Sequence, residues 1–253
     1  MKFKYGKTEI VVCRDYQDLG KVSARTVAAR MKMILAEKDE LRVVLAAGES
    51  QSSFLLSLAE EKGIDWKRVV CFNIDDFWDK RMPLEFSCGA QTNRELYSRV
   101  MPKLVNLVRY NAEDPEVECE RFEKLLKEKP IDILCQGIGT SGHLALNEPN
   151  LCSFTDGKWV RLVELVEQSK KQLIDDPNFK ALGYIPEKGI CMTIPAILLA
   201  GMVYTIVPLG LKKTILTKLS AIESPTESLP ASILLNNPGV LFVDENSCPD
   251  KWR

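Results

Sequence analysis

The only histidine of the chain, His143, stands in a segment whose residue types suit acid–base chemistry. This segment, GIGTSGHLALNEP (residues 137–149), contains three glycines, Gly137, Gly139 and Gly142. Because glycine allows tight turns and a close approach of the backbone to a ligand, we expect these glycines to border a binding site. Imidazole exchanges a proton near neutral pH, and Glu148 is close enough in sequence to orient it and stabilise its charge. A tight turn with an incidental histidine is the alternative.

Two adjacent carboxylates, Asp75 and Asp76, follow an apolar run in the segment FNIDDF (residues 72–77). Adjacent acids at a strand end are often solvated loop residues. Beside an imidazole, one of them becomes a candidate base that removes a proton from the substrate. Its pKa would be tuned by the neighbouring acid and by partial burial. The pair therefore indicates acid–base chemistry only in the company of His143.

Two further segments predict an anion site. In AGESQSS (residues 47–53), glycine and small hydroxyl residues precede a helical pattern, and backbone N–H groups at a helix N-terminus bind anions. Serine is also an ordinary N-cap residue, so this pattern alone is weak. In PLGLKKT (residues 208–214), Lys212 and Lys213 would occupy the first turn of a helix, where the macrodipole disfavours cations. A phosphate bound at the helix start would remove that conflict.

These segments follow short β-branched runs that alternate with longer helical patterns. The clearest strands are expected at residues 41–47, 68–74, 131–137, 202–207 and 240–243, with weaker candidates at 9–13, 158–165 and 189–193. Helices are expected at residues 24–35, 52–62, 93–104, 115–127 and 211–222. This alternation predicts a doubly wound α/β domain with a mostly parallel sheet. Ligands bind such sheets beyond the carboxyl ends of the strands, so the polar segments should meet there.

The composition is that of an ordinary globular protein, with 253 residues, 45% hydrophobic and 27% charged, and we expect one domain over residues 1–253. The formal net charge of −1 offers no global field for nucleic acid or for an anionic membrane. No run approaches the roughly 18 apolar residues of a membrane span, and the first residues lack the apolar stretch of a signal peptide. The eight cysteines occur singly, without CxxC spacing, which disfavours a metal site or a disulfide framework. We therefore expect a cytoplasmic protein.

Together, these segments are similar to those of the glucosamine-6-phosphate deaminase (isomerase) family, whose signatures are roughly GxGxxGHxAFNEP and FNMDEY. The similarity runs in order from residues 47–53 through GLKK to PASIL (residues 230–234), and the histidine-to-NEP block is its most specific part. It implies a Rossmann-like three-layer α/β/α sandwich. It also implies a small phosphorylated sugar as the substrate, and no metal or other cofactor. It leaves open whether the protein forms a homo-oligomer.

The resemblance implies a role for each catalytic residue. Asp75 matches the aspartate that abstracts the proton, and Asp76 takes the place of the glutamate that follows it. His143 matches the histidine that opens the sugar ring, and Glu148 matches its carboxylate partner. Ser141 stands where the family normally has a second carboxylate, an aspartate two residues before the histidine.

The resemblance also implies a phosphate site. Gly48 and Ser50 fall in the phosphate loop, which here is AGESQ instead of the usual TGS/TTP form. In this loop Glu49 brings a negative charge near the expected phosphate, next to Ser50 and Gln51. Lys213 falls on the phosphate-binding lysine. Lys171 lies where the family carries a phosphate-binding arginine.

The implied reaction is an aldose–ketose isomerisation with deamination of a hexosamine 6-phosphate of the glucosamine 6-phosphate type. Its products are a ketose of the fructose 6-phosphate type and ammonia. A hydrolase of the 6-phosphogluconolactonase type is one alternative, because it shares the fold and a GxGxxGH turn. A catalytically silent sugar-phosphate-binding protein is another. The NEP block and FNIDD favour the deaminase branch, while the particular sugar phosphate and the choice between deamination and simple isomerisation stay open.

Overall fold

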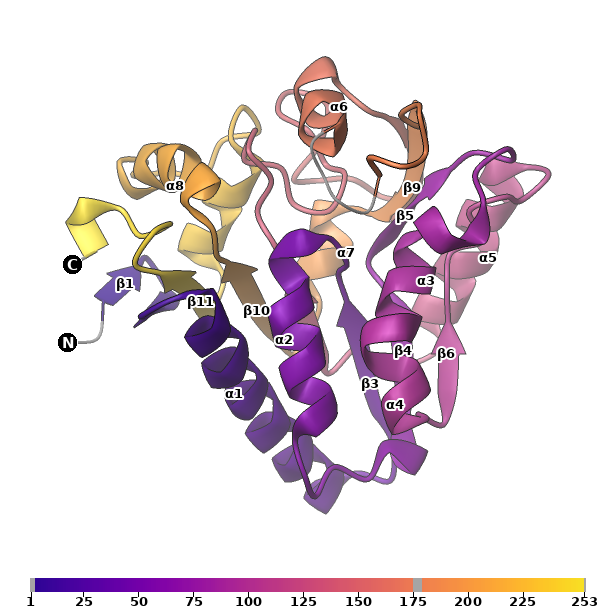
Figure 1. The fold of residues 1–253 in the computed structure, drawn as a ribbon, viewed down its shortest axis with the longest axis horizontal. Coiled ribbons are helices and arrows are strands. Elements are labelled where there is room, and N and C mark those ends of the chain that lie inside the picture. The colour runs from indigo at the N-terminus through magenta and orange to yellow at the C-terminus, as the bar shows by residue number, and fades with distance from the viewer. Residues whose placement is uncertain (1–2, 175–178, 253) are drawn as a thin grey trace.

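An eight-stranded sheet forms the centre of the fold in the computed structural model, which describes residues 3–174 and 179–252 (Figure 1). Neighbouring strands are parallel throughout, except for the antiparallel pair β1–β2 at one edge. In spatial order the strands are β1 (Phe3–Tyr5), β2 (Thr8–Cys13), β11 (Gly239–Asp244), β10 (Met202–Val207), β7 (Ile133–Gln136), β3 (Leu41–Leu45), β4 (Val69–Asn73) and β6 (Leu104–Asn106).

Helices cover both faces of this sheet, so the expected α/β fold with a mostly parallel sheet is confirmed. One face packs against α1 (Tyr16–Glu37), α2 (Glu49–Glu60) and the helical stretch made of α3 (Cys88–Thr92), a π-helical turn (Asn93–Tyr97) and α4 (Ser98–Val100). The other face packs against α5 (Pro115–Lys127), α7 (Ile194–Leu198) and α8 (Lys213–Ser220). None of the helices in the described part of the chain is long and apolar enough to cross a membrane.

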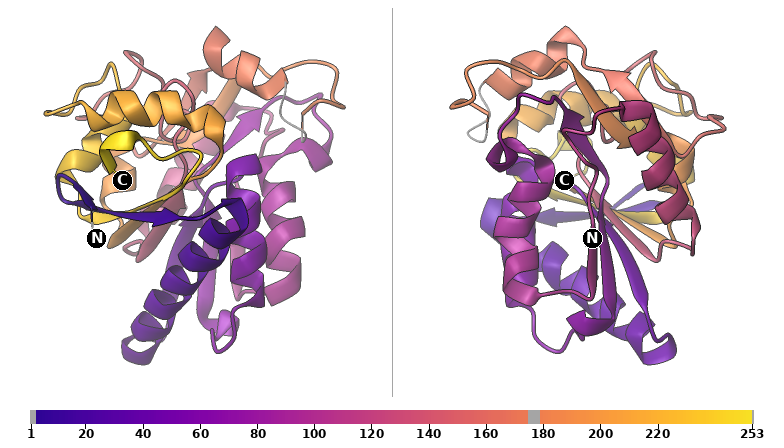
Figure 2. Two further views of the ribbon diagram at one scale, coloured as in Figure 1. Left: turned by 60° about the vertical axis from the view of Figure 1, so that its left-hand side comes forward. Right: turned by 90° about the vertical axis from the view of Figure 1, so that its right-hand side faces the viewer.

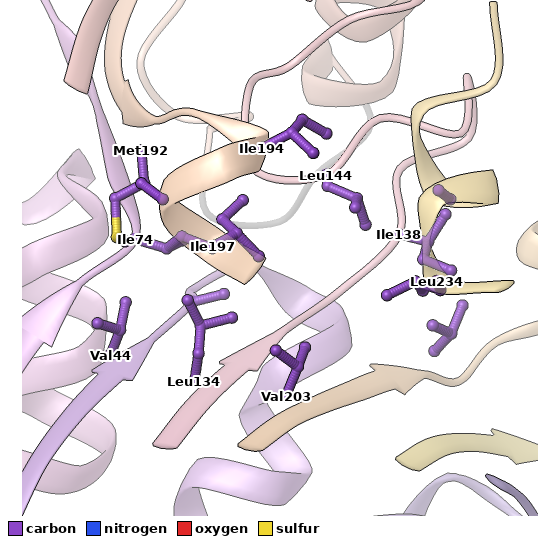
Figure 3. Packing of buried hydrophobic residues seen from close by; sticks show 14 of the residues in the cluster. Val44, Ile74, Leu134, Ile138, Leu144, Met192, Ile194, Ile197, Val203 and Leu234 are labelled. Carbon is purple, nitrogen blue, oxygen red and sulfur yellow. The ribbon is translucent and has the colours of Figure 1, made fainter. Parts of the chain in front are cut away.

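Strands buried on both sides explain why the sheet was visible in the sequence. All five residues of β3 are buried, as expected for a central parallel strand covered by helices on both faces. Side chains alternate along the strand, so Val43 faces α1 and α2 while Val44 faces the opposite core. Figure 3 shows Val44, Leu134 and Val203 in a row on the successive strands β3, β7 and β10, below Ile197 of α7.

A second, smaller sheet lies beyond the carboxyl ends of the parallel strands (Figures 1 and 2). It consists of three antiparallel strands, β5 (Asp75–Trp78), β9 (Lys188–Met192) and β8 (Val160–Glu164). The weaker candidates at residues 158–165 and 189–193 are thus strands, but they belong to this sheet and not to the parallel one. The sequence did not predict β5, because its residues follow β4 after a single intervening residue and no turn pattern separates the two strands.

The parallel sheet has its topological switch point between β3 and β7. From β3 the chain order continues to β4 and β6 on one side, whereas β7, β10 and β11 extend on the other. Two connections therefore leave the carboxyl edge in opposite directions at this point and open a crevice between them. The loop after β3 contains Gly48, and the loop after β7 begins with Gly137. The expected ligand-binding edge is accordingly where both glycine-containing loops lie.

Most helices differ from the sequence prediction at their ends, including α1 and α2, and two of the differences have a visible backbone cause. The helix expected at residues 93–104 begins earlier, at Cys88, and stops at Val100, because Met101 adopts a left-handed conformation with φ 52°. The chain then forms the edge strand β6. At residues 211–222, the expected helix starts with a 3-10 turn (Gly210–Lys212) before α8 begins at Lys213.

Candidate active site

A cavity of about 500 Å³ opens beyond the carboxyl ends of the parallel strands. Its walls include one residue from each segment that follows β3, β4, β7 and β10, namely Gly48, Asp75, Gly137 and Lys212. These residues are far apart in the sequence, and the parallel arrangement of their strands brings them together. The cavity is therefore the place where the four polar segments meet.

His143 lines the cavity and is held from behind by a carboxylate and a hydroxyl. Its Nδ1 lies 3.2 Å from Oε1 of Glu148 and 2.8 Å from Oγ of Ser141. Ser141 in turn donates a hydrogen bond of 2.9 Å to the second carboxylate oxygen, Oε2. Because Nδ1 contacts these groups, Nε2 is the nitrogen available to a ligand in the cavity.

Ser169 makes a further contact with this pair and was not foreseen from the sequence. It lies on α6 (Glu167–Ile174), with its Oγ 3.2 Å from Nδ1 of His143, and it donates a hydrogen bond to Oε1 of Glu148. No motif marks this serine; the only hint is its position two residues before Lys171.

Glu148 is only 2% exposed, and its ionisation depends on these partners. Burial alone would raise its pKa. The hydrogen bond and positive charge of His143, with the hydroxyls of Ser169 and Ser141, outweigh burial and lower the pKa of Glu148 below its ordinary value. The carboxylate is therefore ionised at neutral pH and can stabilise a protonated imidazole.

The loop that carries His143 is shaped by its glycines and by Asn147. A Cβ at Gly139 would lie 2.0 Å from Cε1 and Nε2 of the imidazole, so only glycine fits beside the ring. Asn147 donates hydrogen bonds of 2.8 Å to the carbonyls of Leu144 and Met192, and it thereby ties the loop to β9. These two contacts explain why the block contains both a glycine and an asparagine at fixed distances from the histidine.

Of the three glycines expected at the cavity, Gly137 and Gly139 line it and Gly142 does not. Gly142 has φ 90°, and a Cβ there would lie 2.3 Å from Cδ1 of Leu229. The structure thus places Gly142 outside the lining of the cavity. This glycine lets the turn pack against the segment that contains Leu229.

The two adjacent aspartates have different environments because successive strand residues point to opposite sides. Asp75 lines the cavity. Burial, and next the charge of Asp76, raise the pKa of Asp75 to about 7. A carboxyl group with such a pKa can accept a proton from carbon near neutral pH.

Asp76 faces the opposite way and is 1% exposed. Its carboxylate accepts backbone N–H groups of Phe77, Cys88 and Gly89 at 2.9, 2.9 and 3.0 Å. The structure thus places the Asp76 carboxylate outside the lining of the cavity, where the sequence had led us to expect it. Its side chain anchors the start of α3 to β5 instead.

Apolar side chains form the wall of the cavity on the side of the small sheet and α6. They are Phe77, Phe86, Leu146, Leu165, Leu173 and Phe179. The rings of Phe77 and Phe179 meet edge to face, with centroids 4.8 Å apart. This wall excludes water from one side of Asp75, which is consistent with burial as the main cause of its raised pKa.

The N-terminus of α2 faces the opposite side of the cavity. Gly48, Glu49 and Ser50 all line it, and Gly48 has φ 99°, a backbone conformation that favours glycine. Gln91 was not foreseen from the sequence, yet it holds this loop in place. Its Oε1 accepts the N–H of Gly48 at 3.0 Å, and its Nε2 donates to the Gly48 carbonyl at 3.1 Å.

Gln51 does not line the cavity, contrary to the expectation from the sequence. It is 1% exposed, and its Nε2 donates hydrogen bonds of 3.1 Å to Oγ of Ser50 and to the carbonyl of Ile206. Because Gln51 lies inside the first turn of α2, its side chain points back towards the sheet. It therefore supports Ser50 from below.

Of the two adjacent lysines, the structure brings Lys212 and not Lys213 to the cavity. Lys212 is 4% exposed and lines the cavity, whereas the Nζ of Lys213 forms an exposed ion pair of 3.1 Å with Asp250. Lys212 ends a 3-10 turn and Lys213 begins α8, and successive side chains of a helical segment rotate by about 100–120° around its axis. Neighbouring lysines therefore point in different directions. A second cation, Lys171 of α6, also lines the cavity.

A metal is not needed to account for the polar groups around this cavity. In residues 3–174 and 179–252, no group of three or more histidine, cysteine, aspartate or glutamate side chains is arranged to hold a metal ion. The cavity instead combines a buried carboxyl, an imidazole with a carboxylate partner, a helix N-terminus and two lysines. Such a set can bind an anionic ligand and move protons on it.

Comparison with known proteins gives the same picture for nearly the whole chain. A family model described as "Glucosamine-6-phosphate isomerases/6-phosphogluconolactonase" matches residues 14–243. A glucosamine-6-phosphate deaminase of Mycoplasmopsis pulmonis is 26% identical over 241 residues, which cover 93% of this chain and 91% of that protein. A glucosamine-6-phosphate deaminase of Listeria monocytogenes is 29% identical over 203 residues, which cover 80% and 83% of the two chains.

Solved structures with the same fold come from both branches of that description. A monomeric glucosamine-6-phosphate deaminase superposes with a TM-score of 0.81 at 24% identity, over 94% of this chain and 98% of the other. The 6-phosphogluconolactonase of Thermotoga maritima superposes with a TM-score of 0.71 at 22% identity, over 93% and 99%. At these identities, the likeness concerns the fold.

Proposed function

The chain belongs to the glucosamine-6-phosphate isomerase/6-phosphogluconolactonase family, and we propose that it converts a hexosamine 6-phosphate and water into a ketose 6-phosphate and ammonia. The observation that carries this proposal is the presence of Asp75 and His143 in the walls of one cavity that also contains a helix N-terminus and buried Lys212. The full-length similarity to glucosamine-6-phosphate deaminases supports the same substrate class.

The phosphate binds between the N-terminus of α2 and Lys212. The backbone N–H groups of Glu49 and Ser50 and the Ser50 hydroxyl donate hydrogen bonds to phosphate oxygens, and the helix dipole favours the negative charge. The ammonium group of Lys212 supplies a charge-assisted contact that is shielded from water by its burial. Glu49 is exposed at the rim, so its carboxylate can turn towards solvent.

His143 opens the sugar ring. Its Nε2 takes the proton of the C1 hydroxyl and returns it to the ring oxygen as the bond between C1 and that oxygen breaks. The imidazolium formed between these two transfers is stabilised by Glu148, whose Oε1 lies 3.2 Å from Nδ1. The open-chain aldehyde then has an acidic hydrogen at C2.

Asp75 carries out the isomerisation. It removes the C2 proton while a proton of the C2 ammonium group passes to the carbonyl oxygen, which produces an enolamine. It then returns its proton to C1, which leaves a protonated imine at C2. Water adds to this carbon and ammonia leaves, so that the ketose 6-phosphate is formed. The pKa of Asp75 near 7 suits both halves of the transfer, because the group must be a base first and an acid afterwards.

A 6-phosphogluconolactonase would also need a phosphate site and a proton-transferring imidazole. It would not need a base at C2, because hydrolysis of a lactone breaks only the ester bond. The carboxyl group of Asp75 in the cavity thus favours the deaminase.

A cytoplasmic location is also proposed, supported by eight free cysteines, because free thiols suit a reducing compartment.

The proposal is tested with a panel of glucosamine 6-phosphate, galactosamine 6-phosphate, glucose 6-phosphate and 6-phosphogluconolactone. Ammonia, ketose and acid release are measured for each compound. Equal amounts of ammonia and ketose from one of the amino sugars are expected. Acid release from the lactone alone would identify a lactonase, ketose without ammonia an isomerase, and tight binding without turnover a silent sugar-phosphate-binding protein.

A further inference from the structure

We propose that Ser169 is a positioning residue that holds the His143–Glu148 pair in its reactive arrangement from a separate element, α6. Ser169 belongs to α6, which lies between β8 and β9, whereas His143 and Glu148 belong to the loop after β7. The inference rests on the proposed function only in that His143 is the group that opens the ring. The role of Ser169 itself follows from its contacts.

The hydrogen bonds around Glu148 define this role. A serine hydroxyl has one proton to donate and two lone pairs that accept. Ser169 gives its proton to Oε1 of Glu148 and Ser141 gives its proton to Oε2, so both carboxylate oxygens are occupied. The oxygens of both hydroxyls then face Nδ1 of His143, at 3.2 and 2.8 Å, with their lone pairs.

Three oxygens therefore surround Nδ1, and each of them can accept a hydrogen bond from it. These three acceptors stabilise the tautomer with the proton on Nδ1. In this tautomer Nε2, which faces the cavity, carries the lone pair. Nε2 must carry that lone pair for the ring to take a proton from the sugar. Ser169 is 4% exposed and Glu148 2%, so these hydrogen bonds lie in a region of low dielectric constant, where they are stronger than in water.

Helix α6 connects this arrangement to the ligand. Lys171 and Leu173, on the same helix, both line the cavity. Ser169 and Leu173 are four residues apart and therefore lie on one side of the helix. A substrate that contacts Lys171 or Leu173 consequently sets the position of α6, and with it the position of the Ser169 hydroxyl. The structure thus assigns to one helix both a contact with the ligand and the support of the imidazole.

The single histidine allows a direct test that requires no turnover. In protein labelled with ¹⁵N-histidine, nitrogen and carbon-bound proton signals report the tautomer of His143 alone. The wild-type protein is expected to show the Nδ1–H tautomer predominantly. In Ser169→Ala, the share of the Nε2–H tautomer is expected to rise about twofold or more, because one acceptor for Nδ1–H is lost. Ser169→Cys roughly keeps the volume of the side chain, but a thiol is a poor hydrogen-bond partner. This variant should therefore show the same rise in the Nε2–H tautomer as Ser169→Ala.

Ser23→Ala is the matched control. Ser23 is also a fully buried serine, but its hydroxyl bonds within α1, to the carbonyls of Leu19 and Gly20, far along the chain from this site. It should lose some stability and leave the signals of His143 unchanged. Unfolding curves of all variants show which of them remain folded. If Ser169→Ala does not fold, the tautomer of His143 is measured in Ser169→Cys instead.

Kinetics add a second criterion with the hexosamine 6-phosphate identified by the panel. Ser169→Ala should lower kcat about tenfold with little change in KM, because it weakens an interaction that supports the proton transfer. An unchanged tautomer of His143 in both folded Ser169 variants would overturn the inference. The NMR result does not depend on activity. A protein that proves inactive towards every phosphosugar therefore contradicts the proposed function without deciding the role of Ser169.

Discussion

Gly139 and His143 are packed so closely that a Cβ on residue 139 would lie 2.0 Å from both Cε1 and Nε2 of the imidazole. Contacts this short do not occur between non-bonded atoms, so one of the two groups would have to move. The ring is fixed on its other side by Ser141 and Glu148. The position of the reactive nitrogen therefore depends on the absence of a side chain at residue 139.

We predict that Gly139→Ala displaces the imidazole and lowers kcat/KM about 100-fold or more, since a shift of about 1 Å in a reacting group has effects of this size. The measurement is turnover of the amino-sugar phosphate, with circular dichroism to show that the fold persists. Gly157→Ala is the matched control, because a Cβ there meets no atom within 4 Å. Wild-type activity of Gly139→Ala would contradict the catalytic position of His143.

The two neighbouring aspartates should respond differently to the same substitution. Asp75→Asn removes the base from the cavity, so exchange of the substrate C2 hydrogen with solvent should stop while binding stays nearly intact. Asp76→Asn keeps the cavity but weakens the acceptor of three backbone N–H groups, and it should mainly lower stability. The measurements are C2 hydrogen exchange by NMR and thermal unfolding. Continued exchange in Asp75→Asn would transfer the base to another residue.

The raised pKa of Asp75 predicts a pH dependence of activity. Because Asp75 must be ionised to remove the C2 proton and its pKa is about 7, kcat/KM should rise between about pH 6 and 8. Substrate phosphate also titrates near pH 6, so the profile is compared with the pH dependence of binding. A profile that is flat from pH 5 to 8, with binding constant, would rule out Asp75 as a base with this pKa.

The same pKa predicts that Asp75 lowers stability in neutral solution. Its folded-state pKa of about 7 lies above the ordinary value of about 4, so between these pH values the folded state holds a proton that the unfolded state has lost. Stability attributable to this group therefore falls as pH rises from about 4 to 7 and stays low above that. At pH 8, the free energy of unfolding of Asp75→Asn should exceed that of the wild-type protein by about 1–3 kcal/mol. At pH 4 the gain should be small, and equal gains at both values would contradict the argument.

The position of the lysines predicts different effects on substrate affinity. Lys212→Ala removes a buried cation from the cavity, and KM for a phosphorylated substrate should rise about tenfold or more. Lys213→Ala removes only an exposed ion pair with Asp250, which contributes little to stability or binding. The check is steady-state kinetics of both variants, together with competition by inorganic phosphate. The opposite order of effects would restore the assignment of Lys213 that the sequence resemblance implied.

The residues that directly follow parallel strands could be identified from the sequence. Gly48, Asp75 and Gly137 each come within a few residues of a buried apolar run, and chain order alone places the carboxyl ends of parallel strands at one edge. The spacing from Gly139 to His143 and Glu148 is also local, because one loop contains all three. These features can be recognised from the sequence because each of them is determined by a single segment and the strand that precedes it.

Other features depended on contacts between segments or on the direction of single side chains. Ser169 reaches Glu148 across 21 positions, and Gln91 holds Gly48 across 43, without any repeated pattern that would mark them. Lys212 and Lys213 are chemically identical neighbours, and only the packing of α8 and the turn before it decides which of them lines the cavity. A sequence specifies which residue types are present, whereas the packing of separate elements determines which of them share one cavity.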